Sequence, residues 1–145
     1  MAVFSSSNRD AAAYPLQSLF VPFPFVCFTL ALATDLAFWQ TANLMWQNFS
    51  SWLLFAGLVF GAIGLLAGLL DLVRRRTRPL RPGFFSVLLY LLILVLALVN
   101  SFIHAGDGWT AVVPYGLALS AITFVLCLLA AISSSRKYAR LAWRV

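Results

Sequence analysis

The 145-residue chain is 63% hydrophobic and 10% charged, whereas soluble domains average about 45–50% and about 25%, so we exclude an ordinary soluble domain. Its formal net charge of +6 could suggest a nucleic-acid partner, but nine of the ten basic residues lie in two short runs, at 74–81 and 136–144, beside apolar segments. Such runs are typical of the cytoplasmic flanks of membrane spans, and we therefore expect no nucleic-acid binding.

Four apolar stretches follow along the chain, and each is long enough to cross a bilayer as a helix. A hydrocarbon core of about 30 Å requires about 20 apolar residues. The stretches that meet this length are residues 19–39, 52–73, 84–104 and 112–132. Pro22 and Pro24 have no backbone N–H, so we expect a distorted or delayed start to the first helix. The sequence predicts an all-α fold, in which residues 1–145 form a single transmembrane four-helix bundle.

The loops between the stretches differ in charge, which predicts their side of the membrane. The loop after the second stretch contains five arginines, whereas residues 40–51 and 105–111 contain no Lys or Arg. By the positive-inside rule the arginine loop is cytoplasmic, and alternation then places both termini in the cytoplasm. Tryptophans support this orientation, since four of the five lie at the expected outer ends: Trp39, Trp46, Trp52 and Trp109.

Charged residues at the inner ends are interpreted as anchors. Asp71 lies one turn before Arg74 and Arg75, so we expect it to pair with one of them and, together with Arg76, to hold the helix end at the cytoplasmic surface. Residues 136–145 form a short basic cytoplasmic tail. Its helical spacing leaves two alternatives open, an interfacial helix or a frayed basic end.

Small residues predict where the helices pack, because they allow close backbone approach in lipid. The second stretch carries two GxxxG pairs on one face, and the fourth repeats the pattern of small residues. The first stretch shows the pattern more weakly with Cys27, Ala31 and Thr34, and we expect these three faces to meet in the bundle. The packing residues so predicted are Gly57, Gly61, Gly64, Gly68, Gly116 and Ser120.

No motif predicts catalysis, so we expect a protein that is not an enzyme and that has no catalytic residues. A single histidine is a poor match for zinc or a b-type haem, so no metal site or cofactor is expected. Cys27 and Cys127 lie inside apolar stretches and are interpreted as small packing residues. A thiol pair between neighbouring helices is the alternative.

Asp35 is a candidate polar site residue, because it lies about one turn below the expected outer surface. Asn100 and His104 lie one turn apart near the same end of the third stretch. If these groups converge with Asp107 of the following loop, they form a small polar site open to the outside, able to relay a proton or hold a cation. The alternative is a set of hydrated interfacial groups.

Three short motifs resemble a known family. They are Tyr14-Pro15-Leu16-Gln17, the VPFP run at 21–24, and Gly68-Leu69-Leu70-Asp71 at the end of the second stretch. Together they resemble an uncharacterised bacterial family catalogued as domain of unknown function 2231, over about residues 14–132. Members usually carry His-Pro-x-His where this sequence has Tyr14 and Gln17, so the chain resembles a divergent member that cannot bind haem or metal at those positions.

Two classes of function fit these observations. We favour a non-catalytic accessory or assembly subunit of a larger complex, such as a bioenergetic or pigment-containing one, in the bacterial inner membrane. Its expected partners are the lipid bilayer, other membrane protein subunits, and a pigment or quinone docked on aromatic surface. The alternative is a small oligomeric transporter or proton-conducting unit that uses Asp35 and His104.

Overall fold

The computed structural model describes residues 16–73, 83–106 and 112–142, with side chains as far as residue 135. These residues contain four helices that are long and apolar enough to cross a membrane, and no strand. The four candidate spans are Gln17–Thr41, Leu44–Val73, Phe84–Ala105 and Val112–Ser135. The predicted all-α fold with four spans is thus confirmed.

The first span begins with a short helix, α1 (Gln17–Phe20), followed by α2 (Pro22–Thr41). Val21 between them keeps helical dihedral angles (φ −56°, ψ −36°), so the chain continues in nearly the same direction. Pro22 and Pro24 supply no N–H to the first turn of α2, which is why the helix is interrupted where the sequence predicts distortion. The helical conformation nevertheless starts before the prolines, so the entry is not delayed.

The connection between the first two spans is much shorter than the loop expected at residues 40–51. α2 ends at Thr41, and α3 (Leu44–Val73) begins three residues later. Ala42 adopts the left-handed conformation (φ 51°, ψ 21°) and its N–H donates to the oxygen of Phe38 at 2.7 Å. The side chain of Asn43 then accepts from the N–H of Met45 at 3.0 Å and caps α3. Because of the left-handed residue and the cap, most of the segment expected as a loop is helical.

The last two spans are α4 (Phe84–Ala105), and the short π-helical segment η2 (Val112–Gly116) with α6 (Leu117–Ala142). Val113 is extended (φ −118°, ψ 121°) because it precedes Pro114, so the chain bends within η2. α6 continues without a break to Ala142, so the backbone of residues 136–142 prolongs the fourth span and is not a separate helix. Residues 143–145 of the predicted tail lie outside the described residues.

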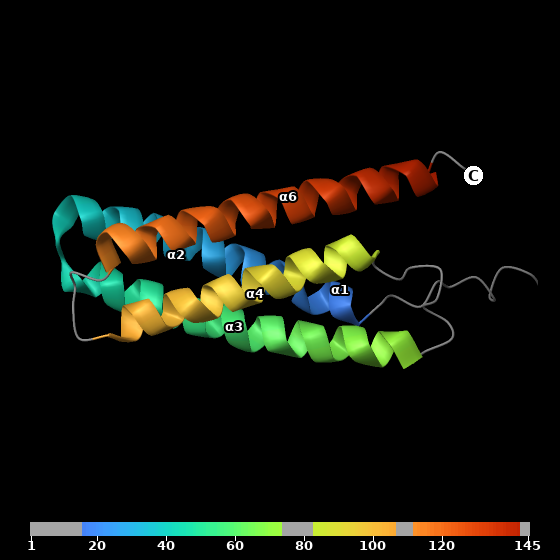
Figure 1. Cartoon of the computed structure of the whole chain (residues 1–145), viewed down its shortest axis with the longest axis horizontal. Coiled ribbons are helices and arrows are strands. Elements are labelled where there is room, and N and C mark those ends of the chain that lie inside the picture. Colours follow the sequence, from blue (N-terminus) through green and yellow to red (C-terminus); the bar gives the residue numbers. More distant parts are fainter. Residues whose placement is uncertain (1–15, 74–82, 107–111, 143–145) are drawn as a thin grey trace, which may run out of the picture.

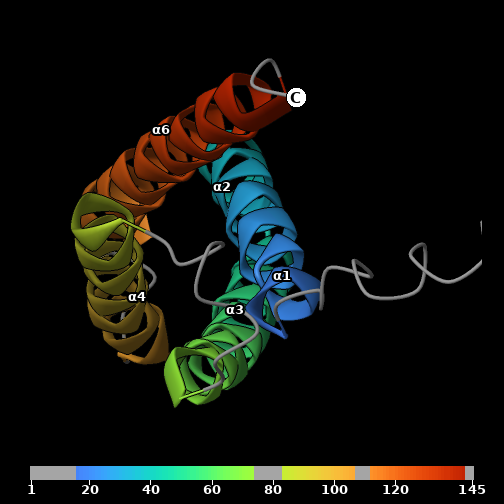
Figure 2. The same ribbon diagram turned by 90° about the vertical axis from the view of Figure 1, so that its right-hand side faces the viewer.

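The long helices run alternately up and down (Figure 1) and form a ring when viewed end-on (Figure 2). Neighbours around the ring are α2 and α3, α3 and α4, α4 and α6, and α6 and α2. α1 lies beside α3, as the end-on view in Figure 2 shows. Each span therefore packs against the spans that precede and follow it in the chain, and the first and last also pack together.

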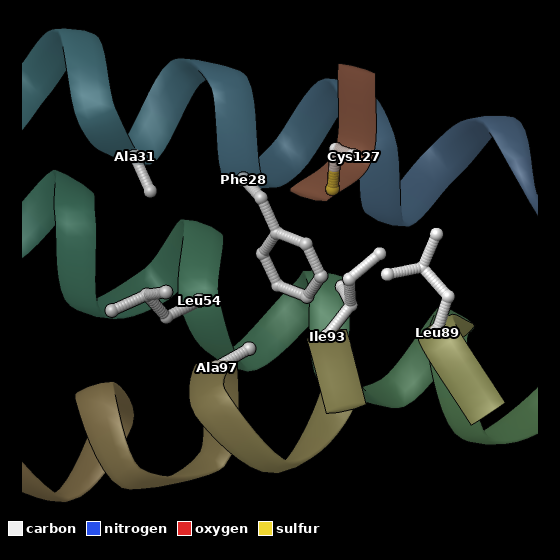
Figure 3. Close-up of a cluster of buried hydrophobic side chains, with 7 residues drawn as sticks. All are labelled: Phe28, Ala31, Leu54, Leu89, Ile93, Ala97 and Cys127. Atoms are coloured by element: carbon white, nitrogen blue, oxygen red, sulfur yellow. The ribbon is translucent and has the colours of Figure 1, made fainter. Parts of the chain in front are cut away.

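The interior of the ring contains a compact apolar cluster (Figure 3) to which all four spans contribute. Its members are Phe28, Ala31, Leu54, Leu89, Ile93, Ala97 and Cys127. Cys27 and Cys127 are both free thiols. Large apolar side chains such as Trp52 (71% exposed) and Phe102 (70% exposed) cover the outside of the bundle. This distribution suits a bundle in lipid, where apolar side chains are solvated on the outside as well as packed within.

Candidate functional site

Asp35 on α2 is fully buried, and its carboxylate contacts one residue from each of the other three spans. Oδ1 accepts a hydrogen bond from the hydroxyl of Ser50 on α3. The same oxygen lies 2.8 Å from Nε2 of His104 on α4, and Oδ2 accepts from Oγ of Ser120 on α6 at 2.5 Å. We refer to Asp35, Ser50, Asn100, His104 and Ser120 as the polar site.

Ser50 enters this site because the turn between α2 and α3 is tight. The early start of α3 at Leu44 places Ser50 on a helix, fully buried and facing α2. Its Oγ also lies 3.2 Å from the backbone oxygen of Ala31, one turn before Asp35. The single hydrogen of the hydroxyl can therefore be donated to either of two acceptors.

His104 is held by both of its ring nitrogens. Nδ1 lies 2.9 Å from the backbone oxygen of Asn100, and a carbonyl oxygen can only accept, so Nδ1 carries a hydrogen. Nε2 faces Oδ1 of Asp35, and a 2.8 Å contact between these atoms requires one hydrogen between them. Whether that hydrogen resides on nitrogen or on oxygen, the pair is net neutral, which limits the cost of placing it in a membrane span.

Asn100 and Gly116 complete the surroundings of the histidine. Nδ2 of Asn100 donates to Oγ of Ser120 at 2.7 Å, while its Oδ1 has no hydrogen-bond partner in the described part of the chain. A Cβ at Gly116 would lie 2.9 Å from Cε1 of His104 and 3.4 Å from Oδ1 of Asn100. A side chain at position 116 would therefore displace the imidazole.

The structure brings together Asp35, Asn100 and His104, the three residues singled out in the sequence as a candidate polar site. The site differs from the expected one because it is closed, with Asp35 0% and His104 4% exposed. Asp107, expected to join it, lies outside the described residues. Sequence reasoning missed Ser50, which it placed in a loop, and assigned Ser120 only to packing. Ser50 and Ser120 are both small hydroxyl residues near the same end of the bundle as Asp35, and this shared feature could have identified them in the sequence.

Asp71 at the other end of the bundle is buried and contacts the start of the first span. Its Oδ2 accepts from the backbone N–H of Gln17 at 3.1 Å. The expected partners Arg74 and Arg75, and Arg76 of the same anchor, lie outside the described residues. Asp71 therefore joins α3 to α1.

The glycines of α3 lie where neighbouring helices come close. A Cβ at Gly57 would lie 2.5 Å from Cε1 of Phe28, and one at Gly64 would lie 2.9 Å from Oη of Tyr90. At Gly61 it would collide with Leu94, and at Gly68 it would lie 3.1 Å from Cδ of Gln17. The glycine face is thus directed toward side chains of α1, α2 and α4. The expected contact with the first span is confirmed, whereas the expected contact with the small residues of the fourth span is wrong, because α6 lies across the ring from α3.

The apolar cluster separates the polar site from Asp71. On α2 the cluster residues Phe28 and Ala31 precede Asp35, and on α4 Leu89, Ile93 and Ala97 precede Asn100. The polar site thus lies at the end of the bundle where α2 turns into α3, on the left of Figure 1. In the described ranges, no three His, Cys, Asp or Glu side chains gather as metal ligands would.

Comparison with known proteins yields one family. The family described as predicted membrane protein (DUF2231) matches residues 13–144, which include all four spans. No curated protein and no solved structure matches the chain.

Proposed function

This chain belongs to the DUF2231 family of predicted membrane proteins, and from that premise we propose that it is a non-catalytic accessory or assembly subunit of a larger membrane complex. Its four apolar helices make it an integral, multi-pass membrane protein. The subunit role goes further than the family and concerns what the bundle contacts in the membrane.

The observation that carries this proposal is the distribution of polar and apolar side chains. Hydrogen bonds of the polar site link side chains of all four spans, so the polar site serves to hold the helices together. The outside instead carries large aromatic side chains, of which Trp52, Phe55 and Phe102 are examples. Aromatic surface of this kind supports lateral contacts with other subunits or with lipid.

The location that we propose is the bacterial inner membrane, with both termini in the cytoplasm. Support comes from the arginine-rich connection between α3 and α4, which the positive-inside rule assigns to the cytoplasm. A pigment or quinone is a further proposed partner, since flat rings stack on aromatic side chains. Phe23 and Phe60, whose ring centroids are 4.8 Å apart, form one such aromatic surface, and Phe23 is 49% exposed.

Within the bundle we propose that small residues serve helix packing. The close approach of Phe28 to Gly57 and of Tyr90 to Gly64 supports this role for the GxxxG face of α3. Gly116 supports close packing of η2 against His104 in the same way.

The proposed subunit role is tested by extracting the tagged protein from its native membrane in mild detergent. Native electrophoresis, absorption spectroscopy and mass spectrometry then identify what migrates with it. We expect a stoichiometric complex larger than this chain. A colourless monomer or homo-oligomer, recovered without other subunits, would contradict the subunit role.

A second candidate is the small transporter or proton-conducting unit, which the 2.8 Å contact between Asp35 and His104 favours. A through-going path would have to cross the apolar cluster, which is why we rank it second. The test compares proton flux into proteoliposomes for the wild type and Asp35→Asn. Conduction through the site predicts a flux that the substitution abolishes, and equal fluxes would remove this candidate.

A further inference from the structure

We propose that Asp35 and His104 form a binding site for a single proton, which exchanges with one side of the membrane, the side on which the turn between α2 and α3 lies. The ligand is a proton held between Oδ1 of Asp35 and Nε2 of His104. This proposal is independent of the subunit role.

The site holds one proton and is disrupted by its removal. With that proton present, the 2.8 Å contact is a hydrogen bond and the pair is neutral. Without it, a carboxylate oxygen and the lone pair of Nε2 would face each other, because the Asn100 carbonyl retains the other ring hydrogen on Nδ1. Deprotonation therefore leaves one negative charge in the span and breaks the link between α2 and α4.

The neighbouring hydroxyls can form hydrogen bonds whether the proton is on Asp35 or on His104. When Asp35 is a carboxylate, Ser50 and Ser120 both donate to it. When the proton moves to Oδ1, the hydroxyl of Ser50 can turn to the Ala31 oxygen at 3.2 Å. Both arrangements keep the carboxyl, the imidazole and the two hydroxyls hydrogen-bonded, so transfer within the pair requires only a hydroxyl rotation.

Access to the Asp35–His104 pair is one-sided. His104 is the second-last residue of α4, and Asp35 lies six residues before the end of α2, about 9 Å at about 1.5 Å per residue. In the other direction lies the apolar cluster, with Ala31 and Ala97 directly beyond the site. Protons can therefore reach the pair over a short distance from one end alone.

Among the described residues, no titratable side chain other than those of Asp35 and His104 belongs to the polar site. α3 contributes Ser50 and α6 contributes Ser120, neither of which titrates. Tyr115 of η2 is 69% exposed, and Cys127 lies about two turns along α6 from Ser120. A pH response of the polar site is thus assigned to the Asp35–His104 pair.

The decisive measurement is ¹⁵N NMR of the full-length protein in lipid nanodiscs, with labelled histidine. Because the chain has one histidine, the two ring signals are those of His104. We expect Nδ1 to be protonated throughout the pH range in which the protein is folded, and the Nε2 signal to shift to that of a bare nitrogen accepting from an amide on Asp35→Asn, since the proton shared with the carboxyl is then gone. A wild-type ring with a bare Nδ1, or ring signals unchanged by Asp35→Asn, would overturn the site.

A control and a flux measurement complete the test. Asp71→Asn makes the same change in the other buried aspartate and should leave both ring signals in place. One-sided access predicts that proteoliposomes conduct protons no faster than protein-free liposomes. Flux above that level that is lost on Asp35→Asn would show that protons reach the pair from both sides of the membrane. It would overturn one-sided access but not the binding of a proton by Asp35 and His104. If Asp35→Asn does not fold, the wild-type ring signals and the flux still decide both points.

Discussion

Asp35 shows how a single buried carboxylate can organise a bundle that has little else to distinguish one helix register from another. An unpaired charge in a span costs several kcal/mol, so Asp35 is stable only where donors surround it. Ser50, His104 and Ser120 supply them from three different helices. A shift of any span by one residue would remove a donor, so these hydrogen bonds select one arrangement of the four helices.

This dependence can be tested at Ser120. We expect Ser120→Ala to lower the free energy of unfolding by about 1–3 kcal/mol, because Oδ2 of Asp35 loses its donor and Asn100 loses its acceptor. Denaturant titration in detergent micelles measures the change. Ser133→Ala is the matched control, since that hydroxyl is exposed and bonds only to its own helix. Equal effects of the two substitutions would argue against the polar site as a stabilising unit.

Gly57 tests the close approach of α2 and α3. A Cβ there would lie 2.5 Å from the ring of Phe28, which is 1% exposed and has no free space to move into. We expect Gly57→Ala to destabilise the protein by roughly 1–3 kcal/mol. Gly83→Ala, where nothing lies within 4 Å of the added Cβ, should change stability little. The same titration measures both, and a neutral Gly57→Ala would mean that the two helices can separate at no cost.

At the scale of elements, the turn between α2 and α3 is the feature on which the site depends. It replaces a polar loop by two residues, one of them Ala42 in a left-handed conformation that side chains disfavour by roughly 1–2 kcal/mol. The benefit is that α3 begins early enough to carry Ser50 to Asp35. Local strain at the turn is thus offset by hydrogen bonding in the bundle.

Substitution of Ala42 by glycine measures that strain. We expect Ala42→Gly to stabilise the protein by up to about 1 kcal/mol, since glycine adopts positive φ without steric cost. Ala33→Gly makes the same chemical change at an exposed position within α2 and should instead destabilise by roughly 0.5–1 kcal/mol. Thermal unfolding of both variants in one detergent gives the comparison. If Ala42→Gly destabilised the protein as Ala33→Gly does, the turn would be unstrained.

At the scale of the whole molecule, the up-and-down ring sets which ends share a side of the membrane. Gly83 precedes α4 and Gly106 follows it, so the two glycines lie at opposite ends of one span. The arginine-rich connection adjoins Gly83, and the proposed orientation therefore places Gly83 in the cytoplasm and Gly106 outside.

Cysteine labelling checks this orientation. In a Cys27→Ala, Cys127→Ala background, we expect Gly106→Cys to react in intact cells with a maleimide that cannot cross the membrane. Gly83→Cys should react only after the membrane is permeabilised. Both glycines are exposed, so a difference in labelling reports on sidedness. The reverse pattern would invert the proposed topology.

The sequence alone predicted the four spans, because length and hydrophobicity are properties of each segment and need no knowledge of its neighbours. It also singled out Asp35, Asn100 and His104, since charged and amide groups in a span are costly enough to stand out. It assigned Ser50 to a loop, because hydropathy falls in that segment although the backbone remains helical.

Only the tertiary structure decided the order of the helices around the ring and the closure of the site. These depend on how α2, α3, α4 and α6 pack, and lipid-solvated helices carry no strong apolar stripe that would indicate the packed face in advance. The structure likewise decided that Asp71 accepts from the start of α1, since the N–H of Gln17 belongs to a segment 54 residues away in the chain. Hydrogen bonds over such separations are set by the packed bundle, and local sequence does not specify them.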